Sequence, residues 1–106
     1  MDKLKLIEAI LGSKDFCGEE EVPFQVGEKV FIRCVTNFWT GRISKLCGNF
    51  ITLGEAAWIA DTGRFSQAIN DGSLSEVEPV DVPVRINLGS VVDVMEWKHA
   101  LPRVQK

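Results

Sequence analysis

The feature that most constrains this chain is a series of strand-like segments separated by tight-turn residues in its central part. Residues 30–35 are rich in β-branched and apolar side chains, and residues 38–46 and 50–53 continue the same character. Asn37 marks the first turn, and Cys47-Gly48-Asn49 marks the second. Because strands this close in sequence usually pair with each other, the pattern predicts an antiparallel meander.

The second of these segments also predicts the two faces of its strand. Alternation places the polar side chains Thr40, Arg42 and Ser44 on one face and Trp39, Gly41, Ile43 and Lys45 on the other. Gly41 inside the strand predicts the sharp bend that a small curved sheet requires.

The segments around the meander are predicted from periodicity and turn residues. Residues 2–11 place apolar side chains at helical spacing, which predicts a short amphipathic helix, and residues 15–21 have the composition of an acidic linker. After the third strand, Gly54-Glu55 predicts a turn that leads into a fourth short strand at residues 56–60.

The C-terminal half is predicted to hold one more helix and further strands. Phe65, Ala68 and Ile69 follow the turn Asp61-Thr62-Gly63 at helical spacing, and Asp61 or Thr62 would be the N-cap. Residues 77–84 are predicted to be extended, and because Pro79 and Pro83 interrupt them, any strand there lies at a sheet edge. The remaining predictions are strands at residues 84–88 and 90–97 and an irregular tail at residues 98–106.

The order of these elements resembles the strand pattern of Sm-like and SH3-like small barrels. The motifs that carry this resemblance are Gly27-x-x-Val30-x-Ile32, Thr40-Gly41-Arg42-Ile43, Asn49-Phe50-Ile51-Thr52-Leu53 and Ala56-Ala57-Trp58. The resemblance implies a mainly β fold, a small barrel with a short N-terminal helix and a second short helix after the Asp61-Thr62-Gly63 turn. The single domain would span residues 1–106, with helix and linker at 1–22, barrel and inserted helix at 26–97, and tail at 98–106. Sm-like proteins assemble through edge strands, so the resemblance also implies a homo-oligomer.

Charge argues against a general nucleic-acid binder. The formal net charge is -3 and the sequence pI is about 5.1, whereas affinity for phosphates depends on clustered Lys and Arg. The strongest local exception is Arg42 and Lys45 beside Trp39, which would form a small basic and aromatic patch. We therefore expect nucleic acid not to be a partner.

The cysteine and histidine content argues against a metal or redox site. Cys17, Cys34 and Cys47 include no CxxC pair, and His99 is the single histidine. We predict that all three cysteines are buried packing residues and that the protein uses no metal or cofactor. No apolar run reaches the roughly 18 residues of a membrane span, so we expect a cytoplasmic protein in the host cytosol without a membrane partner.

A longer block resembles a family of small proteins of unassigned function that phages and prophages encode. The matching segments are Ala57-Trp58-Ile59-Ala60-Asp61-Thr62-Gly63-Arg64-Phe65, residues 74–79 and residues 99–103. The resemblance implies a phage origin. Small phage-encoded oligomers include counter-defence proteins that bind host nucleotide signals, and sequestration of such a signal is the function this resemblance implies.

The same block supplies candidate ligand-binding groups. Trp58 and Phe65 offer aromatic faces for stacking, and Arg64 offers a bidentate donor for an anion. Thr62 and Gly63 would present backbone N–H groups at the start of a helix, and Asp61 and Arg42 complete the predicted site for a nucleotide-like anion. The alternative is that both rings belong to the core and that Arg64 pairs with Asp61 or a glutamate.

Three functions are open at this point. The first is non-enzymatic binding of a nucleotide-like small molecule in an oligomer, and the second is interaction with a host or phage protein, as in virion assembly. The third is an enzyme, either an aspartic-type hydrolase at Asp61-Thr62-Gly63 or a phosphodiesterase that uses His99. In aspartic-type hydrolases two carboxylates share a proton, and the positive charge of Arg64, directly after the triplet, disfavours that protonated pair. A polar cluster of Asp93, Glu96, Trp97, Lys98, His99 and Arg103 is predicted in a solvated tail or a subunit contact.

Overall fold

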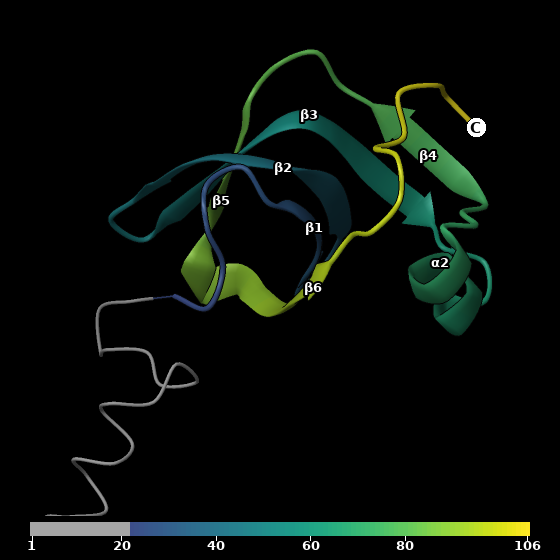
Figure 1. The fold of residues 1–106 in the computed structure, drawn as a ribbon, viewed down its shortest axis with the longest axis horizontal. Coiled ribbons are helices and arrows are strands. Elements are labelled where there is room, and N and C mark those ends of the chain that lie inside the picture. Colours follow the sequence, from purple (N-terminus) through teal and green to yellow (C-terminus); the bar gives the residue numbers. More distant parts are fainter. Residues whose placement is uncertain (1–21) are drawn as a thin grey trace, which may run out of the picture.

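A computed structural model describes residues 22–106 of the chain, in which six antiparallel strands form one sheet (Figure 1). The elements are β1 (Lys29–Cys34), β2 (Phe38–Cys47), β3 (Phe50–Asp61), α2 (Phe65–Asp71), β4 (Glu76–Pro79), β5 (Val84–Asn87), the 3-10 turn η1 (Leu88–Ser90) and β6 (Val91–Glu96). The predictions of a helix at residues 2–11 and a linker at residues 15–21 lie outside the described residues.

The strand order explains how a short chain forms a curved sheet. The order is β4-β3-β2-β1-β6, and β5 pairs with another part of β3. Consecutive strands β1, β2 and β3 pair as the predicted meander, and β6 returns to pair with β1. The prediction of a mainly β fold is confirmed, but the sheet remains open, so closure into a barrel is not confirmed.

The predicted turn at Gly54-Glu55 is wrong, because β3 runs through this position as one long strand. Glu55 has a φ of 49°, and the register with β2 shifts between Thr40 and Arg42. These features are typical of a β-bulge, which bends a strand without ending it. The bend lets the first half of β3 pair with β5 and the second half pair with β4.

The predicted faces of β2 hold up to Ser44 and fail at Lys45. The register with β1 is continuous from Phe38 to Arg42, so Thr40 lies on the same face as Arg42, although Thr40 is buried and Arg42 is exposed. Lys45 is exposed, and the register of β2 with β3 shifts between Ile43 and Lys45. The prediction is therefore wrong at Lys45, since strict alternation holds only where the register is continuous.

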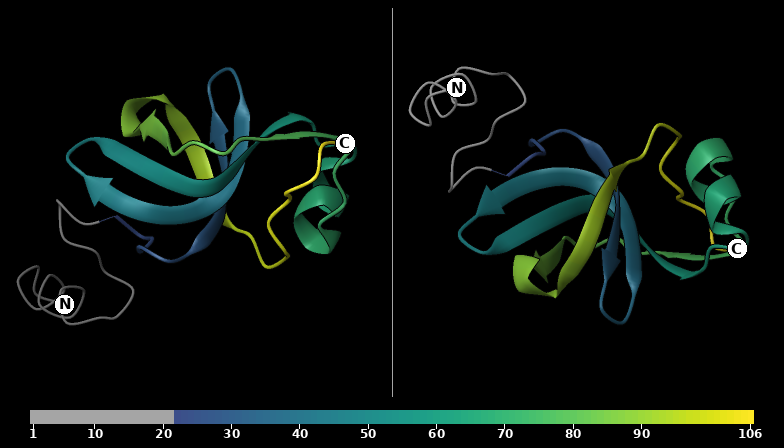
Figure 2. Two further views of the ribbon diagram at one scale, coloured as in Figure 1. Left: turned by 90° about the horizontal axis from the view of Figure 1, so that it is seen from above. Right: turned by 90° about the horizontal axis from the view of Figure 1, so that it is seen from below.

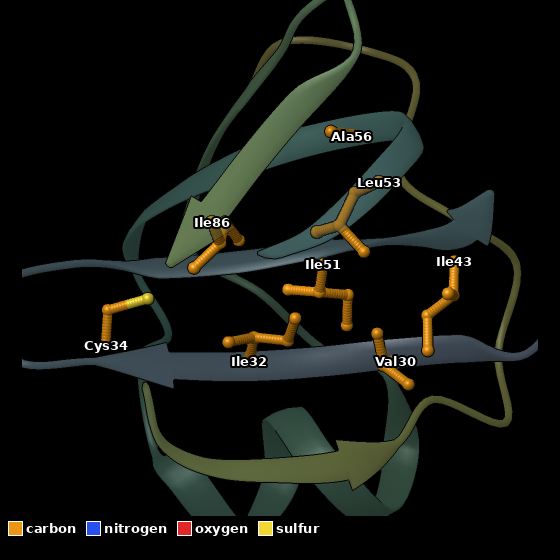
Figure 3. Close-up of a cluster of buried hydrophobic side chains, with 8 residues drawn as sticks. All are labelled: Val30, Ile32, Cys34, Ile43, Ile51, Leu53, Ala56 and Ile86. Atoms are coloured by element: carbon orange, nitrogen blue, oxygen red, sulfur yellow. The ribbon is translucent and has the colours of Figure 1, made fainter. Parts of the chain in front are cut away.

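Two hydrophobic clusters lie on opposite faces of the sheet. The first comprises Val30, Ile32, Cys34, Ile43, Ile51, Leu53, Ala56 and Ile86, which gather between the strands in Figure 3. The second comprises Phe31, Ala57, Ile59, Ala68, Leu74, Val77 and Trp97. Neighbouring residues of β1 alternate between the clusters, as a pleated strand requires. The first cluster fills the curved part of the sheet, and the second binds α2 and the C-terminal segment.

The C-terminal segment has no regular secondary structure, as predicted, and most of its residues are exposed, but hydrogen bonds attach it to the rest of the domain. It runs from β6 past α2 and ends beside β4 (Figure 2). The indole Nε1–H of Trp97 donates to the Ala100 carbonyl at 3.0 Å. Arg103 donates to the Ala56 carbonyl at 2.9 Å and to the Val80 carbonyl at 3.1 Å. The tail is therefore part of the folded domain.

The cysteines divide by environment. Cys34 is buried as predicted, whereas Cys47 at the end of β2 is exposed, so the prediction of a packing role is wrong there. Cys17 lies outside the described residues. Burial raises the pKa of the Cys34 thiol, which favours the unreactive protonated form. Among residues 22–106, no helix has the length and apolar character needed to cross a membrane.

Thr40 gives a direct test of the packing around the bulge. Its hydroxyl is buried and has no hydrogen-bond partner within residues 22–106. A buried hydroxyl without a partner costs about 1–3 kcal/mol. We expect Thr40→Val to raise the free energy of unfolding by about 1 kcal/mol in urea titrations, because valine keeps the shape and removes the hydroxyl. Thr40→Ser is the control, and a destabilised Thr40→Val would show that the hydroxyl has a partner.

Candidate functional site

The Asp61-Thr62-Gly63 turn links the end of β3 to α2. The Gly63 N–H donates to Oδ1 of Asp61 at 2.8 Å, and Gly63 has a φ of 69° that glycine tolerates readily. The turn is therefore stabilised by the Asp61 carboxylate. The N-cap of α2 is Arg64, with no side-chain capping bond, so the prediction of Asp61 or Thr62 as N-cap is wrong.

Trp58 and Phe65 lie on opposite faces of the sheet. Ala57 and Ile59 belong to the second cluster, so Trp58 between them points to the other face. On that face Trp58 pairs with Trp39 of β2, whose side chain packs against the first cluster. Phe65 instead contacts Phe31 of the second cluster, with ring centroids 6.1 Å apart in an edge-on arrangement. The two rings do not form one stacking site.

The guanidinium of Arg33 covers the ring of Phe65, although Arg33 was not among the residues predicted for the site. The guanidinium carbon of Arg33 lies 5.1 Å from the centroid of the Phe65 ring, within range of a cation–π contact. Nε of Arg33 donates to both carboxylate oxygens of Asp93 at 2.8 Å, and Nη2 also donates to Oδ2. This cluster of Asp93, Arg33, Phe65 and Phe31 ties β6 and β1 to α2.

The ion pair makes stability depend on pH in a defined direction. The hydrogen bonds from Arg33 lower the pKa of Asp93 below its ordinary value of 3.8. A lowered pKa in the folded state adds stability above the unfolded value, and that stability is lost as pH falls through the folded value. Because both side chains are about one third exposed (37% and 33%), solvent screens the pair and limits its contribution.

We therefore expect Asp93→Asn to lower the urea midpoint at pH 7 and to have a smaller effect near pH 3. The reason is that the stability gained from the lowered pKa of Asp93 is fully present above the pKa of the unfolded state and decreases as the pH falls below it. Urea titrations of both proteins at the two pH values provide the measurement. An equal loss at both pH values would show that Asp93 acts through packing and not through its charge.

The two arginines of the predicted site are in different places. Arg64 is exposed, and no ion pair to it is found within residues 22–106, so its predicted pairing with Asp61 or a glutamate is not observed. Arg42 donates to the Gly27 carbonyl at 3.0 Å and lies 3.6 Å from Glu55. Arg42 pairs across the sheet with Gly54, far along β3 from Asp61. The structure does not bring it to the turn.

The residues proposed for catalysis occupy structural positions. A ring nitrogen of His99 lies 2.8 Å from the Ile69 carbonyl, and the imidazole stacks edge-on against Trp97 at 4.8 Å. Asp93 pairs with Arg33, Trp97 is buried, and Arg103 binds backbone carbonyls. The predicted polar cluster does not form as one group, because Trp97 and His99 contact each other whereas Asp93 and Arg103 bind elsewhere in the domain. Within residues 22–106, no group of three metal-ligating side chains is found.

Two hollows on the surface are formed by residues outside the predicted site. The larger has a volume of about 460 Å³ and is lined by Pro23, Phe24, Glu28, Val30, Val91, Val92, Asp93, Val94 and Glu96. The smaller, of about 320 Å³, is lined by Glu78, Pro79, Val80 and Gln105. Neither is lined by Trp58, Arg64 or Phe65. The sequence signal for the larger one is the valine-rich strand β6, which we interpreted only as structural.

Comparison of the sequence with protein-family models and with curated proteins found no match.

Proposed function

We propose that this chain is a non-enzymatic binding protein that recognises another protein through the sheet face around Trp58. The observation that carries this proposal is the exposure of Trp58, a residue that is 38% exposed and whose side chain points to the face opposite α2. Trp58 lies between Trp39 of β2 and Glu78 of β4 in the register of the sheet. Tryptophan is among the residues that contribute most to protein interfaces.

The exposed area is large enough to matter for binding. A tryptophan side chain has roughly 250 Å² of surface, so an exposed fraction of 38% leaves about 95 Å² in water. Burying that area against a partner would contribute about 2 kcal/mol at roughly 25 cal/mol per Å². The rigid sheet also fixes the ring before binding, which reduces the entropy lost on association.

A protein partner fits this surface better than a nucleotide does. Capture of a nucleotide at residues 58–65 requires both rings and Arg64 to converge, and Trp58 and Phe65 lie on opposite sheet faces. The ring of Phe65 is already in contact with Arg33. The resemblance to phage-encoded proteins would make the partner a host or phage protein. A small-barrel relationship and a homo-oligomer are compatible with the meander and the return of β6 to β1.

Affinity capture with three forms of the protein tests the proposal. The unmodified protein and Phe50→Ala should retain the same stoichiometric partner from an extract of cells that naturally make the protein. Trp58→Ala should retain at least about tenfold less, because the loss of about 2 kcal/mol corresponds to more than a factor of ten. Phe50 is a suitable control because its side chain is 46% exposed in another part of β3.

Quantitative mass spectrometry reports both proteins and small molecules in the same samples. Circular dichroism should first show that both variants fold. Equal retention of the partner by Trp58→Ala would contradict the proposal. A nucleotide retained by the unmodified protein and lost in Arg64→Ala would favour the small-molecule function instead.

A further inference from the structure

The two ends of the sheet differ in how their edges are covered. At β4, the Val77 N–H donates to the Lys106 carbonyl at 3.1 Å, and the Lys106 N–H donates back at 3.0 Å. The C-terminal segment thus protects this edge. At the other end, β6 pairs with β1 on one side and has no strand partner on its outer side within residues 22–106. An uncovered edge is a template for an added strand.

The backbone of β6 presents its free groups in a predictable pattern. The Trp97 N–H donates to the Lys29 carbonyl at 2.9 Å, which fixes the phase of the β1–β6 ladder. Opposed residues in an antiparallel pair alternate between hydrogen-bonded and non-hydrogen-bonded positions. Met95 therefore bonds toward β1, whereas the N–H and C=O groups of Val94 and Glu96 point outward. These outward groups are available to a new strand.

The larger hollow lies along this strand and has a defined chemistry. Val30, Val91 and Val94 give it an apolar lining, and Phe24 adds an aromatic side chain. All the ionisable side chains that line it are acidic: Glu28, Asp93 and Glu96. Since Asp93 is paired with Arg33, the carboxylates of Glu28 and Glu96 are the ones left to attract a ligand.

We propose that the outer edge of β6 and this groove bind an extended, cationic segment of a partner protein as an additional strand. The backbone of the segment bonds to Val94 and Glu96. Val94 and Glu96 are two positions apart on β6 and therefore share one face of the sheet. The side chains of the segment that point to this face thus include apolar ones, which enter the groove, and Lys or Arg ones, which meet Glu28 and Glu96. A second copy of this chain fits less well through its own β6, because that pairing brings the Asp93 and Glu96 carboxylates of both copies together. This surface lies at the β6 edge, whereas Trp58 lies on β3, two strands beyond β1 in the sheet order.

The test uses the full-length protein and a fluorescein-labelled heptapeptide, Lys-Thr-Val-Thr-Lys-Thr-Val, followed by fluorescence anisotropy. In an extended strand all the lysine and valine side chains of this peptide lie on one face. We expect saturable binding, and at least tenfold weaker binding for the matching heptapeptide in which glutamate replaces each lysine. The lysine peptide with N-methyl groups on alternate residues keeps its charge but loses backbone donors. It should also bind at least tenfold more weakly, because strand addition depends on those donors.

Two variants of Glu96 distinguish the contribution of its carboxylate to peptide binding from that of its backbone N–H. Glu96→Thr removes only the carboxylate and should weaken binding several-fold, whereas Glu96→Pro also removes the outward N–H and should weaken it at least tenfold further. Proline at this position leaves the ladder to β1 intact, because the Glu96 N–H points outward. Glu78→Gln on β4 is the matched charge control and should leave peptide affinity unchanged, as should Trp58→Ala. Circular dichroism checks that each variant folds.

Several outcomes would overturn the proposal. Absence of binding would do so, and so would equal binding of the N-methylated peptide, which would indicate diffuse charge attraction. If Glu78→Gln and Glu96→Thr weakened peptide binding equally, the binding would also be due to diffuse charge attraction and not to the β6 edge. A multimeric solution mass that Glu96→Pro reduces to a monomer, without peptide binding to the unmodified protein, would assign the edge to a second copy of the chain.

Discussion

Replacing Trp97 by alanine should remove about 3–5 kcal/mol from the free energy of unfolding, the largest loss expected for a single substitution here. Trp97 is 2% exposed, and its ring stacks on Phe31 with centroids 6.0 Å apart. It also contacts His99. The substitution would leave a cavity at the centre of the second cluster, where β1, β6 and the C-terminal segment meet. Urea titration followed by far-ultraviolet circular dichroism measures the effect.

A matched substitution separates cavity formation from loss of the indole hydrogen bond. Trp97→Phe keeps an aromatic ring against Phe31 but loses the bond from Nε1 to the Ala100 carbonyl. It should cost less than Trp97→Ala and should increase hydrogen exchange in the C-terminal segment, including the Lys106 amide. If Trp97→Ala cost less than about 1 kcal/mol, the second cluster would not be a stabilising core.

Substitution of Gly41 by alanine is expected to have the second largest effect. A Cβ atom at Gly41 would lie 2.9 Å from Cβ of Leu53 and 3.1 Å from the Gly54 carbonyl oxygen. These contacts are with the facing strand, so β2 and β3 must separate where the bulge brings them together. We expect a loss of about 1–3 kcal/mol, the range typical of overpacked positions. Thermal or urea unfolding provides the measurement.

Gly54→Ala is the natural control for Gly41→Ala, because the two glycines lie at the same bulge. A Cβ atom at Gly54 would have the Arg42 carbonyl oxygen as its nearest neighbour, at 4.0 Å. Its stability should stay within about 0.5 kcal/mol of the unmodified protein. Equal losses for both variants would show that the close approach at Gly41 does not determine the bend.

The meander and the later strands could be predicted from sequence because they depend on local patterns. Runs of β-branched residues and the turns at Asn37 and Gly48 identify β1, β2 and β3. The spacing of Phe65, Ala68 and Ile69 matches α2. Gly54-Glu55 was misinterpreted because a bulge and a turn use similar residues, and only the partner strand distinguishes them. Local patterns therefore gave the elements but not their lengths.

The candidate site was harder to predict because it depends on which face each side chain occupies. Trp58 and Phe65 are close in sequence, but the pleat of β3 and the turn after it send them to opposite faces. Arg33 and Asp93 are sixty positions apart, so their pairing follows from the β1–β6 register and not from any local motif. The outward edge of β6 likewise depends on the strand order.

The net charge also has a different meaning for the residues that the structure describes. Residues 22–106 carry nine Lys or Arg and nine Asp or Glu, so the formal charge of -3 lies in residues 1–21. The acidic composition of the whole chain therefore does not apply to residues 22–106. Local arrangement decides their electrostatics, as the carboxylates of Glu28 and Glu96 beside β6 illustrate.

Site-specific photo-crosslinking tests most directly whether the Trp58 face is the recognition surface. A benzophenone amino acid would replace Trp58 in one protein and Phe65 in another, and each would be irradiated in an extract of the natural cells. The proposal predicts a discrete protein adduct from position 58 and none from position 65, because these positions lie on opposite faces of the sheet. An adduct from position 65 alone would contradict the proposal.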